Sequence, residues 1–272
     1  MRDYAEAVRS FEHAKAAEAA LHGNLNALNA CVECCDRHTG SNSLALIYED
    51  RDGNGQRFSF EQLQAQAARF ANVLKAKGVI AGDRVAGLMP RTPELLITIL
   101  ATWRLGAVYQ PLFTAFGPKA IEHRLEQSQA KVVITDANNR AKLDEVADCP
   151  SIISVNARAG DADFQQLLAS AEPECAPVLR RGDDPFLLMF TSGTTGPAKP
   201  LEVPLRAIVA FQGYMRDAIE LRPEDNFWNL ADPGWAYGLY YAVTGPLALG
   251  HATTFYDGPF SVESCARIIN KL

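Results

Sequence analysis

The sequence lacks the features that mark several classes of protein. No stretch approaches 18 uninterrupted apolar residues, so a membrane-spanning helix is not expected. Residues 1–23 carry acidic side chains early and contain no continuous apolar core, so we do not expect a signal peptide. Basic residues are not in excess, because 26 Lys and Arg stand against 32 Asp and Glu and the formal net charge is -6. A nucleic-acid-binding surface is therefore not predicted, and a polyanionic ligand would need a local site.

Internal repeats and low-complexity tracts are also missing. Hydrophobic residues make up 48% of the 272 residues and charged residues 21%, which is too apolar a composition for a disordered chain. This length suits one large domain or two small ones. The six cysteines are scattered through a chain large enough to need no disulfides, so we predict a reducing, cytoplasmic setting. No oligomeric state is predicted.

One cysteine cluster allows two interpretations. The segment 31-CVECCDRH-38 brings three thiols and His38 within eight residues, as in a zinc site. No second ligand pair follows at the spacing of a zinc finger, and a helix here would place Cys31 and Cys35 on one face. We favour buried helical cysteines and assign no metal ligand.

The region from about residue 58 to residue 190 alternates amphipathic segments with short apolar runs. Ser59 and Gln62 form a capping box that predicts the start of a helix, and Thr92 with Pro93 predicts the start of another over 93–104. Further helices are expected near 118, at 138–146 and from about 205 to 219. Strands are expected at 84–89, 107–112, 131–135, 151–155 and 185–190. This order predicts an α/β fold with open, doubly wound sheets flanked by helices and joined by right-handed crossovers.

The chain is expected to divide into three parts. We predict a helical or extended N-terminal segment at 1–57, a first α/β subdomain at 58–175 and the start of a second at 176–272. The junction is placed in 171–184, which carries two prolines and several charges. The last segment, 261–272, is predicted to be a helix without a glycine stop, and we expect the second subdomain to be truncated.

The stretch 191-TSGTTGPAKP-200 follows a predicted buried strand directly. A loop at the carboxyl end of a strand in such a sheet lies where these folds bind ligands. Glycines allow backbone N–H groups to approach an anion, hydroxyls add short donors, and a lysine adds a mobile positive charge. Together they predict a polyphosphate site, whose cofactor-binding residues are Thr191, Ser192, Gly193, Thr194, Thr195, Gly196 and Lys199.

Two other interpretations of this loop were weighed. A P-loop of the Walker type fits poorly, because Pro197 and Ala198 separate Gly196 from the lysine and Pro200 stands where Ser or Thr would bind magnesium. A polar surface turn is the simpler alternative. The density of glycine, hydroxyl and lysine side chains after an apolar strand favours the phosphate loop.

The sequence TSGTTG followed by Lys199 resembles the phosphate-binding signature of AMP-forming acyl-CoA synthetases, members of the adenylate-forming superfamily. Segments 29–38 and 105–135 resemble the acetyl- and short-chain acyl-CoA synthetase branch, and 231–258 resembles the part that helps shape its acyl pocket. The resemblance covers nearly the whole chain from about Asn24 onward and implies the N-terminal part of that large domain.

The resemblance implies an ATP-dependent ligase of fatty acid metabolism. A carboxylate attacks the α-phosphate of ATP, and coenzyme A then displaces AMP from the acyl-adenylate. Thr191 and Lys199 would act as catalytic residues by stabilising charge on the departing phosphates. Trp235 is a candidate wall of the substrate pocket, whereas His123 and His251 are better explained as structural or surface residues. The implied small molecules are a carboxylic acid, ATP with Mg²⁺, and coenzyme A.

Two departures from the family pattern leave alternatives open. The usual signature ends in Pro-Lys-Gly, whereas this sequence has Ala198-Lys199-Pro200, which removes one backbone donor. An aromatic-Gly-x-Thr-Glu motif and a C-terminal domain with a catalytic lysine are not found after Tyr256. We therefore expect a fragment that is inactive alone. A non-catalytic nucleotide-binding chain and an enzyme that loads a carrier-protein thiol are the alternatives.

Overall fold

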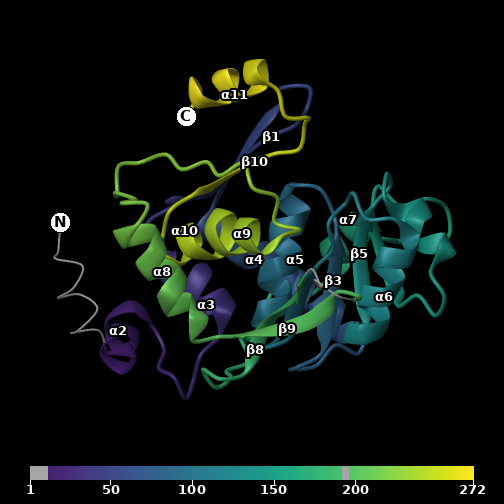
Figure 1. Ribbon diagram of the computed structural model, residues 1–272, viewed down its shortest axis with the longest axis horizontal. Helices are drawn as coiled ribbons and strands as arrows, with labels where there is room; N and C mark the ends of the chain where they lie inside the picture. Colours follow the sequence, from purple (N-terminus) through teal and green to yellow (C-terminus); the bar gives the residue numbers. More distant parts are fainter. Residues whose placement is uncertain (1–11, 192–195) are drawn as a thin grey trace.

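The fold is built around two sheets (Figure 1). A computed structural model of the chain describes residues 12–191 and 196–272. The larger sheet has seven strands in the order β7 (Ala162–Asp163), β6 (Ser151–Val155), β5 (Val132–Asp136), β3 (Arg84–Leu88), β4 (Val108–Pro111), β8 (Pro185–Thr191) and β9 (Lys199–Pro204). The smaller sheet has the order β10 (Thr253–Tyr256), β1 (Leu44–Glu49) and β2 (Gly55–Ser59).

The larger sheet is parallel except at one edge. Strands β3 to β8 pair in parallel, and only β9 runs antiparallel to its neighbour β8. Its connections contain α5 (Pro93–Arg104), α6 (Pro118–Ser128) and α7 (Phe164–Ser170). The predicted α/β class, with parallel strands flanked by helices, is confirmed.

Side chains of alternate strand residues enter two separate cores. Val85 of β3 belongs to the core that contains α5, whereas its neighbour Ala86 belongs to the core that contains Ile121 and Leu125 of α6. Successive side chains of a strand point to opposite faces, so α5 and α6 cover opposite faces of the sheet. This is the doubly wound arrangement, and it fixes α6 over the face opposite the main core.

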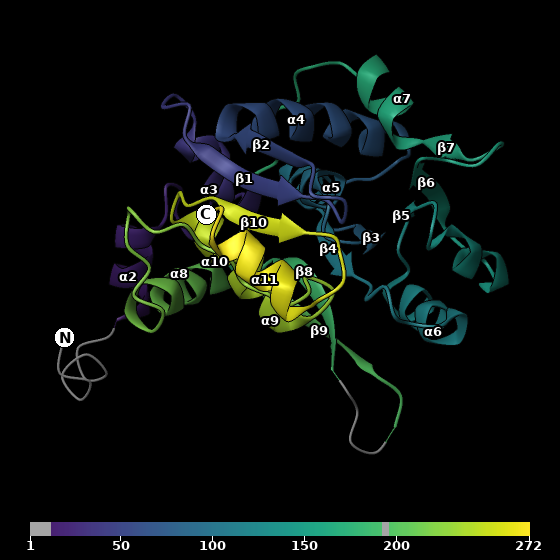
Figure 2. The ribbon, with the colours of Figure 1, turned by 90° about the horizontal axis from the view of Figure 1, so that it is seen from above.

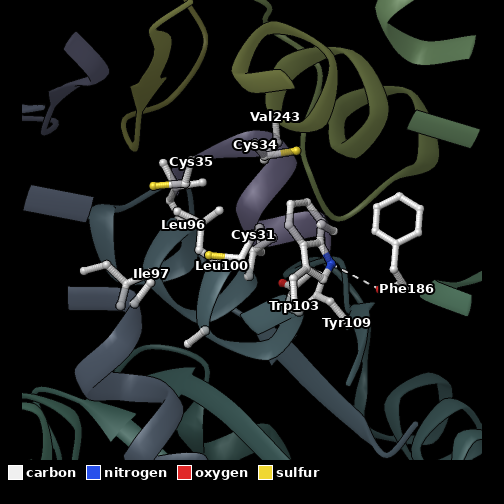
Figure 3. Close-up of a cluster of buried hydrophobic side chains, with 14 of the residues drawn as sticks. Cys31, Cys34, Cys35, Leu96, Ile97, Leu100, Trp103, Tyr109, Phe186 and Val243 are labelled. Atoms are coloured by element: carbon white, nitrogen blue, oxygen red, sulfur yellow. Dashed lines mark hydrogen bonds between the residues drawn. The ribbon is translucent and has the colours of Figure 1, made fainter. Parts of the chain in front are cut away.

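The main core contains side chains from α3, α5, β8 and the segment that holds Val243 (Figure 3). Trp103 of α5 is 1% exposed, packs against Phe186 of β8 with ring centroids 5.3 Å apart, and donates its indole N–H to the Phe186 carbonyl at 3.1 Å. The short helix α3 (Ala30–Cys34) adds Cys31 and Cys34, and Cys35 follows it. The prediction that Cys31 and Cys35 are buried is confirmed.

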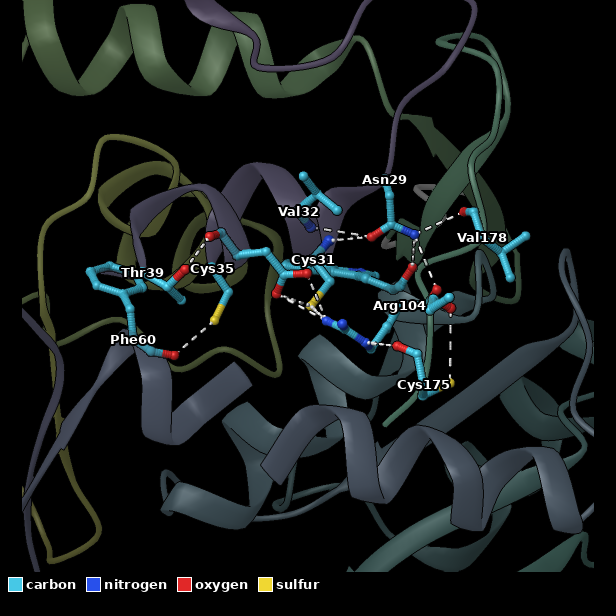
Figure 4. Close-up of polar contacts among 12 residues, drawn as sticks. Asn29, Cys31, Val32, Cys35, Thr39, Phe60, Arg104, Cys175 and Val178 are labelled. Atoms are coloured by element: carbon cyan, nitrogen blue, oxygen red, sulfur yellow. Dashed lines mark hydrogen bonds and ion pairs between the residues drawn. The ribbon is translucent and has the colours of Figure 1, made fainter. Parts of the chain in front are cut away.

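A polar cluster fastens the N-terminal segment to α5 (Figure 4). The Asn29 side chain caps α3 by accepting from the N–H groups of Cys31 and Val32, and its amide donates to the carbonyls of Trp103 and Arg104 at 2.8 and 3.2 Å. It also donates to the Val178 carbonyl at 2.8 Å. One side chain thus satisfies orphan groups at the ends of two helices.

The remaining helices follow the predicted pattern with two differences. The Ser59 and Gln62 capping box begins α4 (Phe60–Ala76), and α8 (Ala207–Asp217) occupies the helix expected from residue 205. The helix predicted at 138–146 is instead a short 3₁₀ helix over Arg140–Glu145. The Asp136 carboxylate accepts from the Asn139 backbone and side-chain N–H groups, and such local bonds compete with a regular helix.

The second difference lies at the predicted C-terminal helix. The predicted helix at 261–272 forms as α11, but it covers Val262–Ile269 and so ends three residues earlier. Ile268 is buried, whereas Val262 and Ile269 are exposed. Other short elements are α2 (His13–Ala20), the 3₁₀ turn Asp36–His38, α9 (Ala236–Gly238), the π-helical turn η3 (Leu239–Thr244) and α10 (Gly245–Ala248).

Candidate nucleotide-binding site

The ends of β8 and β9 bring two predicted catalytic residues opposite each other. Thr191 is the last residue of β8 and pairs across the antiparallel ladder with Lys199, the first residue of β9. The Thr191 hydroxyl donates to the Lys199 carbonyl at 3.5 Å. Because β8 runs parallel to β4, this end lies at the carboxyl edge of the sheet, where the two strands extend from the body of the molecule (Figure 2).

The loop between these strands is described only at its exit. Ser192, Gly193, Thr194 and Thr195 lie outside the described residues. Gly196 is exposed, and a Cβ added to it would meet no atom within 4 Å. Its backbone is not in the left-handed region. Among the described neighbours nothing in the packing around Gly196 requires glycine, and its predicted role depends on the close approach of a ligand.

Lys199 is exposed and has no acidic partner in the described part of the chain. Many other surface cations of this protein do pair with a carboxylate, for example Arg206 with Asp183 at 2.8 Å. An ammonium without a carboxylate partner can pair with the negative charge of a ligand. The residues at this end of the hairpin therefore fit a polyphosphate.

Helix α6 holds the exit of the loop. The His123 Nε2 atom lies 2.9 Å from the Ala198 carbonyl oxygen, and its ring packs edge-on against Phe190 at 6.4 Å between centroids. A carbonyl can only accept, so the imidazole is the donor. The sequence interpretation treated His123 as a structural or surface residue and did not connect it to the loop. No signal in the sequence pointed to this contact, because its partners are 75 residues apart.

Trp235 lies in an aromatic cluster beside the same edge of the sheet. It is 46% exposed and contacts Phe113 and Phe116, which follow β4, with centroids 5.3 and 5.6 Å apart. A Cβ on Gly234 would lie 2.8 Å from the Phe113 Cα, so a glycine is needed for this approach. The indole is thus packed on two phenylalanines and still partly exposed, and its role as an acyl-pocket wall stays a prediction.

A single cation connects this aromatic cluster with β8. The Arg124 guanidinium lies over the Phe116 ring at 4.1 Å and over the Phe190 ring at 5.5 Å. Contacts therefore run from Trp235 through Phe116 and Arg124 to Phe190 at the end of β8. The two regions that the sequence singled out belong to one connected edge of the fold.

The nearby tyrosines mostly serve packing. Tyr240 stacks on Phe211 of α8 at 4.5 Å, and Tyr241 packs against Tyr214 of the same helix at 4.1 Å. These rings hold the π-helical turn against α8. They give no independent indication of a ligand.

Over residues 12–191 and 196–272, no three His, Cys, Asp or Glu side chains are grouped so that they could hold a metal ion. His251 is half-buried, and burial lowers its pKa below the ordinary value. No helix in the described ranges has both the length and the apolar character needed to cross a bilayer.

Comparison with known proteins identifies the family. The family model described as AMP-binding enzyme matches residues 34–272. The chain belongs to the AMP-binding enzyme family. The predicted relationship to AMP-forming acyl-CoA synthetases is thereby confirmed, and the match includes β8, β9 and Trp235.

Individual members of the AMP-binding enzyme family match most of the chain. It is 33% identical over 267 residues to the acetyl-coenzyme A synthetase of Pseudoalteromonas translucida, covering 89% of this chain and 41% of that protein. It is 33% identical over 283 residues to the acetyl-coenzyme A synthetase of Bacillus subtilis, covering 100% of this chain and 49% of that protein. The crystal structure of Brucella canis acyl-CoA synthetase matches with a TM-score of 0.95 at 52% identity, covering 100% of this chain and 51% of that one. The chain thus spans about half the length of these relatives.

Proposed function

We propose that this chain forms part of an ATP-dependent acyl-CoA synthetase, an AMP-forming acid–thiol ligase. Membership of the AMP-binding enzyme family supports this proposal, as do the relatives named as acetyl- and acyl-coenzyme A synthetases. The observation that links the proposal to particular residues is the position of Lys199. It has no acidic partner among the described residues and lies opposite Thr191 at the carboxyl edge of the sheet. The substrates would be a carboxylic acid, ATP and coenzyme A.

Charge on the departing phosphates is the physical demand of the first step. As the carboxylate attacks the α-phosphate, negative charge moves onto the β- and γ-phosphates. Lys199 would neutralise that charge, and Thr191 with the predicted donors Ser192 to Gly196 would bind the phosphate oxygens. Fixed donors of this kind contribute about 3 kcal/mol each to lowering the barrier. Mg²⁺ would accompany ATP, but no metal ligand is assigned among the described residues.

Trp235 is the proposed wall of the acyl pocket. Its half-exposed indole is backed by Phe113 and Phe116, so a bound acyl group would contact a rigid apolar surface. We also propose a role in fatty acid metabolism and a reducing, cytoplasmic setting. The setting is supported by the six cysteines, all of which lie in the described ranges as free thiols.

The proposal predicts a large catalytic defect in a Lys199→Ala variant. In a product of the gene long enough to turn over ATP, the substitution should lower carboxylate-dependent pyrophosphate exchange by about 10²–10³-fold, because charge on the leaving group loses its counter-ion. Lys75→Ala changes an exposed lysine of α4 and serves as the matched control. Exchange at the wild-type rate in Lys199→Ala would show that the lysine takes no part in the reaction.

The substrate is tested in a separate assay of AMP formation. Acetate, butyrate and octanoate are compared with coenzyme A present, using the 272-residue chain and a longer product of the gene. An acyl-CoA synthetase forms AMP and acyl-CoA in equal amounts with at least one acid. AMP formation that does not respond to coenzyme A would contradict the thiol-ligase assignment.

Nucleotide binding without turnover is the second candidate for these 272 residues by themselves. The fact that favours it is the coverage of only 41% to 51% of the relatives' length. Binding of ATP measured by calorimetry, together with no AMP formation by the same sample, would support this candidate. Turnover by the 272-residue chain would exclude it.

A further inference from the structure

Helix α6 supplies a side chain whose position suggests a role in the proposed reaction. We infer that His123 is a positioning residue, which fixes the exit of the loop at Ala198 and thereby orients Lys199 toward the phosphates of ATP. This inference rests on the proposed function of the loop. It is based on the 2.9 Å hydrogen bond between His123 Nε2 and the carbonyl of Ala198, the residue before the lysine.

The exit of the loop has few backbone donors of its own. Pro197 and Pro200 lack an N–H group, so two of the four residues 197–200 cannot donate from the backbone. The described side-chain bond within the hairpin end, from Thr191 to the Lys199 carbonyl, is long at 3.5 Å. β9 is also an edge strand, paired on one side only. His123 therefore adds a donor from outside the hairpin to the β8–β9 ladder at this point.

Helix α6, which carries His123, is anchored in a buried core. Ile121 and Leu125 of α6 are 0% and 4% exposed in the core on the far face of the sheet. The imidazole is confined by the Phe190 ring, and Arg124 fills the space between Phe190 and Phe116. The Arg124 guanidinium is partly buried, and this burial lowers its pKa below the ordinary value. A side chain held in this way can fix the backbone that it binds.

The hydrogen bond affects the orientation of Lys199 by fixing the backbone before it, and His123 itself does not need to contact the substrate. Lys199 has a long, flexible side chain, and the direction of its Cα–Cβ bond depends on the peptide plane between Ala198 and Lys199. A donor bound to that peptide's carbonyl restricts rotation of the plane. Loss of the donor would leave the lysine in place but let it sample more orientations, so ATP would bind less tightly.

Two substitutions separate this role from simple packing. His123→Gln keeps a donor at the position of Nε2, whereas His123→Leu keeps apolar volume and removes the donor. Gln127→Leu, an exposed change on the same helix, is the matched control. The 272-residue chain is used for ATP titration by calorimetry, for hydrogen exchange of peptides covering 196–204 without nucleotide, and for urea unfolding.

We expect His123→Leu to raise the Kd for ATP by about fivefold, the effect of one neutral hydrogen bond, and to speed exchange in 196–204. His123→Gln should restore both values, and the urea midpoint should match that of Gln127→Leu. Equal behaviour of the Leu variant and the wild type in exchange would overturn the inference. So would equal defects in the Leu and Gln variants with a lowered urea midpoint, since that result indicates packing alone.

Lys199→Ala in the same titration distinguishes this inference from the proposed function. If Lys199→Ala weakens ATP binding and His123→Leu does not, the positioning role fails while the phosphate loop stands. If Lys199→Ala has no effect on ATP binding, the loop assignment itself fails. The exchange measurement still decides whether His123 holds the segment, because it needs no nucleotide.

Discussion

At the scale of single residues, burial decides the chemistry of the cysteines and of one histidine. Cys31, Cys34 and Cys35 are each 0% exposed, and burial raises the pKa of all three thiols well above the ordinary value. Removal of the thiolate from water is the largest cause for each of the three. These side chains pack as small apolar groups in the main core.

The burial of these thiols predicts two classes of cysteine. In the native protein, a water-soluble disulfide reagent should react quickly with Cys149, Cys175 and Cys265, which are partly exposed, and slowly with the other three. In urea all six should react at the same rate. The release of chromophore per chain is the measurement. Rapid reaction of six thiols in the native state would show that α3 does not pack as described.

His38 gives a prediction about pH. Its ring packs at a tilt against Phe60 with centroids 5.1 Å apart, and burial lowers its pKa from 6.5 to about 4, with Arg37 adding repulsion. The unfolded chain therefore takes up the proton at higher pH than the folded chain. Stability that is complete above pH 6.5 should be lost progressively as the pH falls toward 4.

The measurement for His38 is the free energy of unfolding in urea at pH 7 and at pH 4.5. His38→Phe should lose less stability than the wild type between these two values, because the titrating group is gone. His13→Phe, at an exposed position, should lose as much as the wild type. A loss in His38→Phe equal to that of the wild type would contradict the pKa direction.

At the scale of elements, a buried ion pair connects the turn after α3 with the end of α5. The Arg104 guanidinium donates to both Asp36 oxygens at 2.8 and 2.9 Å and to the Cys175 carbonyl at 2.5 Å. Both side chains are largely buried, at 8% and 13% exposed. Such a pair adds little to the stability of the fold beyond what a well-packed apolar pair would give. Loss of one partner, however, leaves an uncompensated buried charge.

Asp36→Ala should therefore lower the free energy of unfolding by about 3–5 kcal/mol, and the double variant Asp36→Leu with Arg104→Met by clearly less. Asp183→Ala breaks the exposed pair with Arg206 and should cost less than about 1 kcal/mol. Urea unfolding of the four proteins is the measurement. A single variant as stable as the exposed-pair control would mean that Arg104 finds another partner or water.

The elements predicted best are those with local signals. The Ser59 capping box and the Thr92–Pro93 start placed α4 and α5 correctly, since each signal lies within one turn of its helix. The pairing of β1 with β10 was not predicted, because it joins residues such as Leu46 and Thr253 that are about 200 positions apart. The 3₁₀ turn at 140–145 was missed because Asp136 bonds outweighed the apolar spacing.

At the scale of the whole molecule, the candidate site depends on contacts between distant segments. Residue types alone predicted the chemistry of the loop, and the structure adds that Thr191 and Lys199 are paired at the carboxyl edge. The same reasoning did not find His123, whose partner Ala198 is fixed only by tertiary structure. The division of the chain after residues 57 and 175 stays a prediction. β8 and β9 nevertheless belong to the same seven-stranded sheet as β3 to β7, so the loop between them is attached to the larger sheet.

The proposed position of ATP at the ends of β8 and β9 can be tested by hydrogen exchange of the 272-residue chain with and without the nucleotide. We expect slower exchange in peptides that cover 186–204, loss of this protection in Lys199→Ala, and no change in α7 or β10. Protection confined to another part of the molecule, or equal protection in Lys199→Ala, would show that ATP does not bind there.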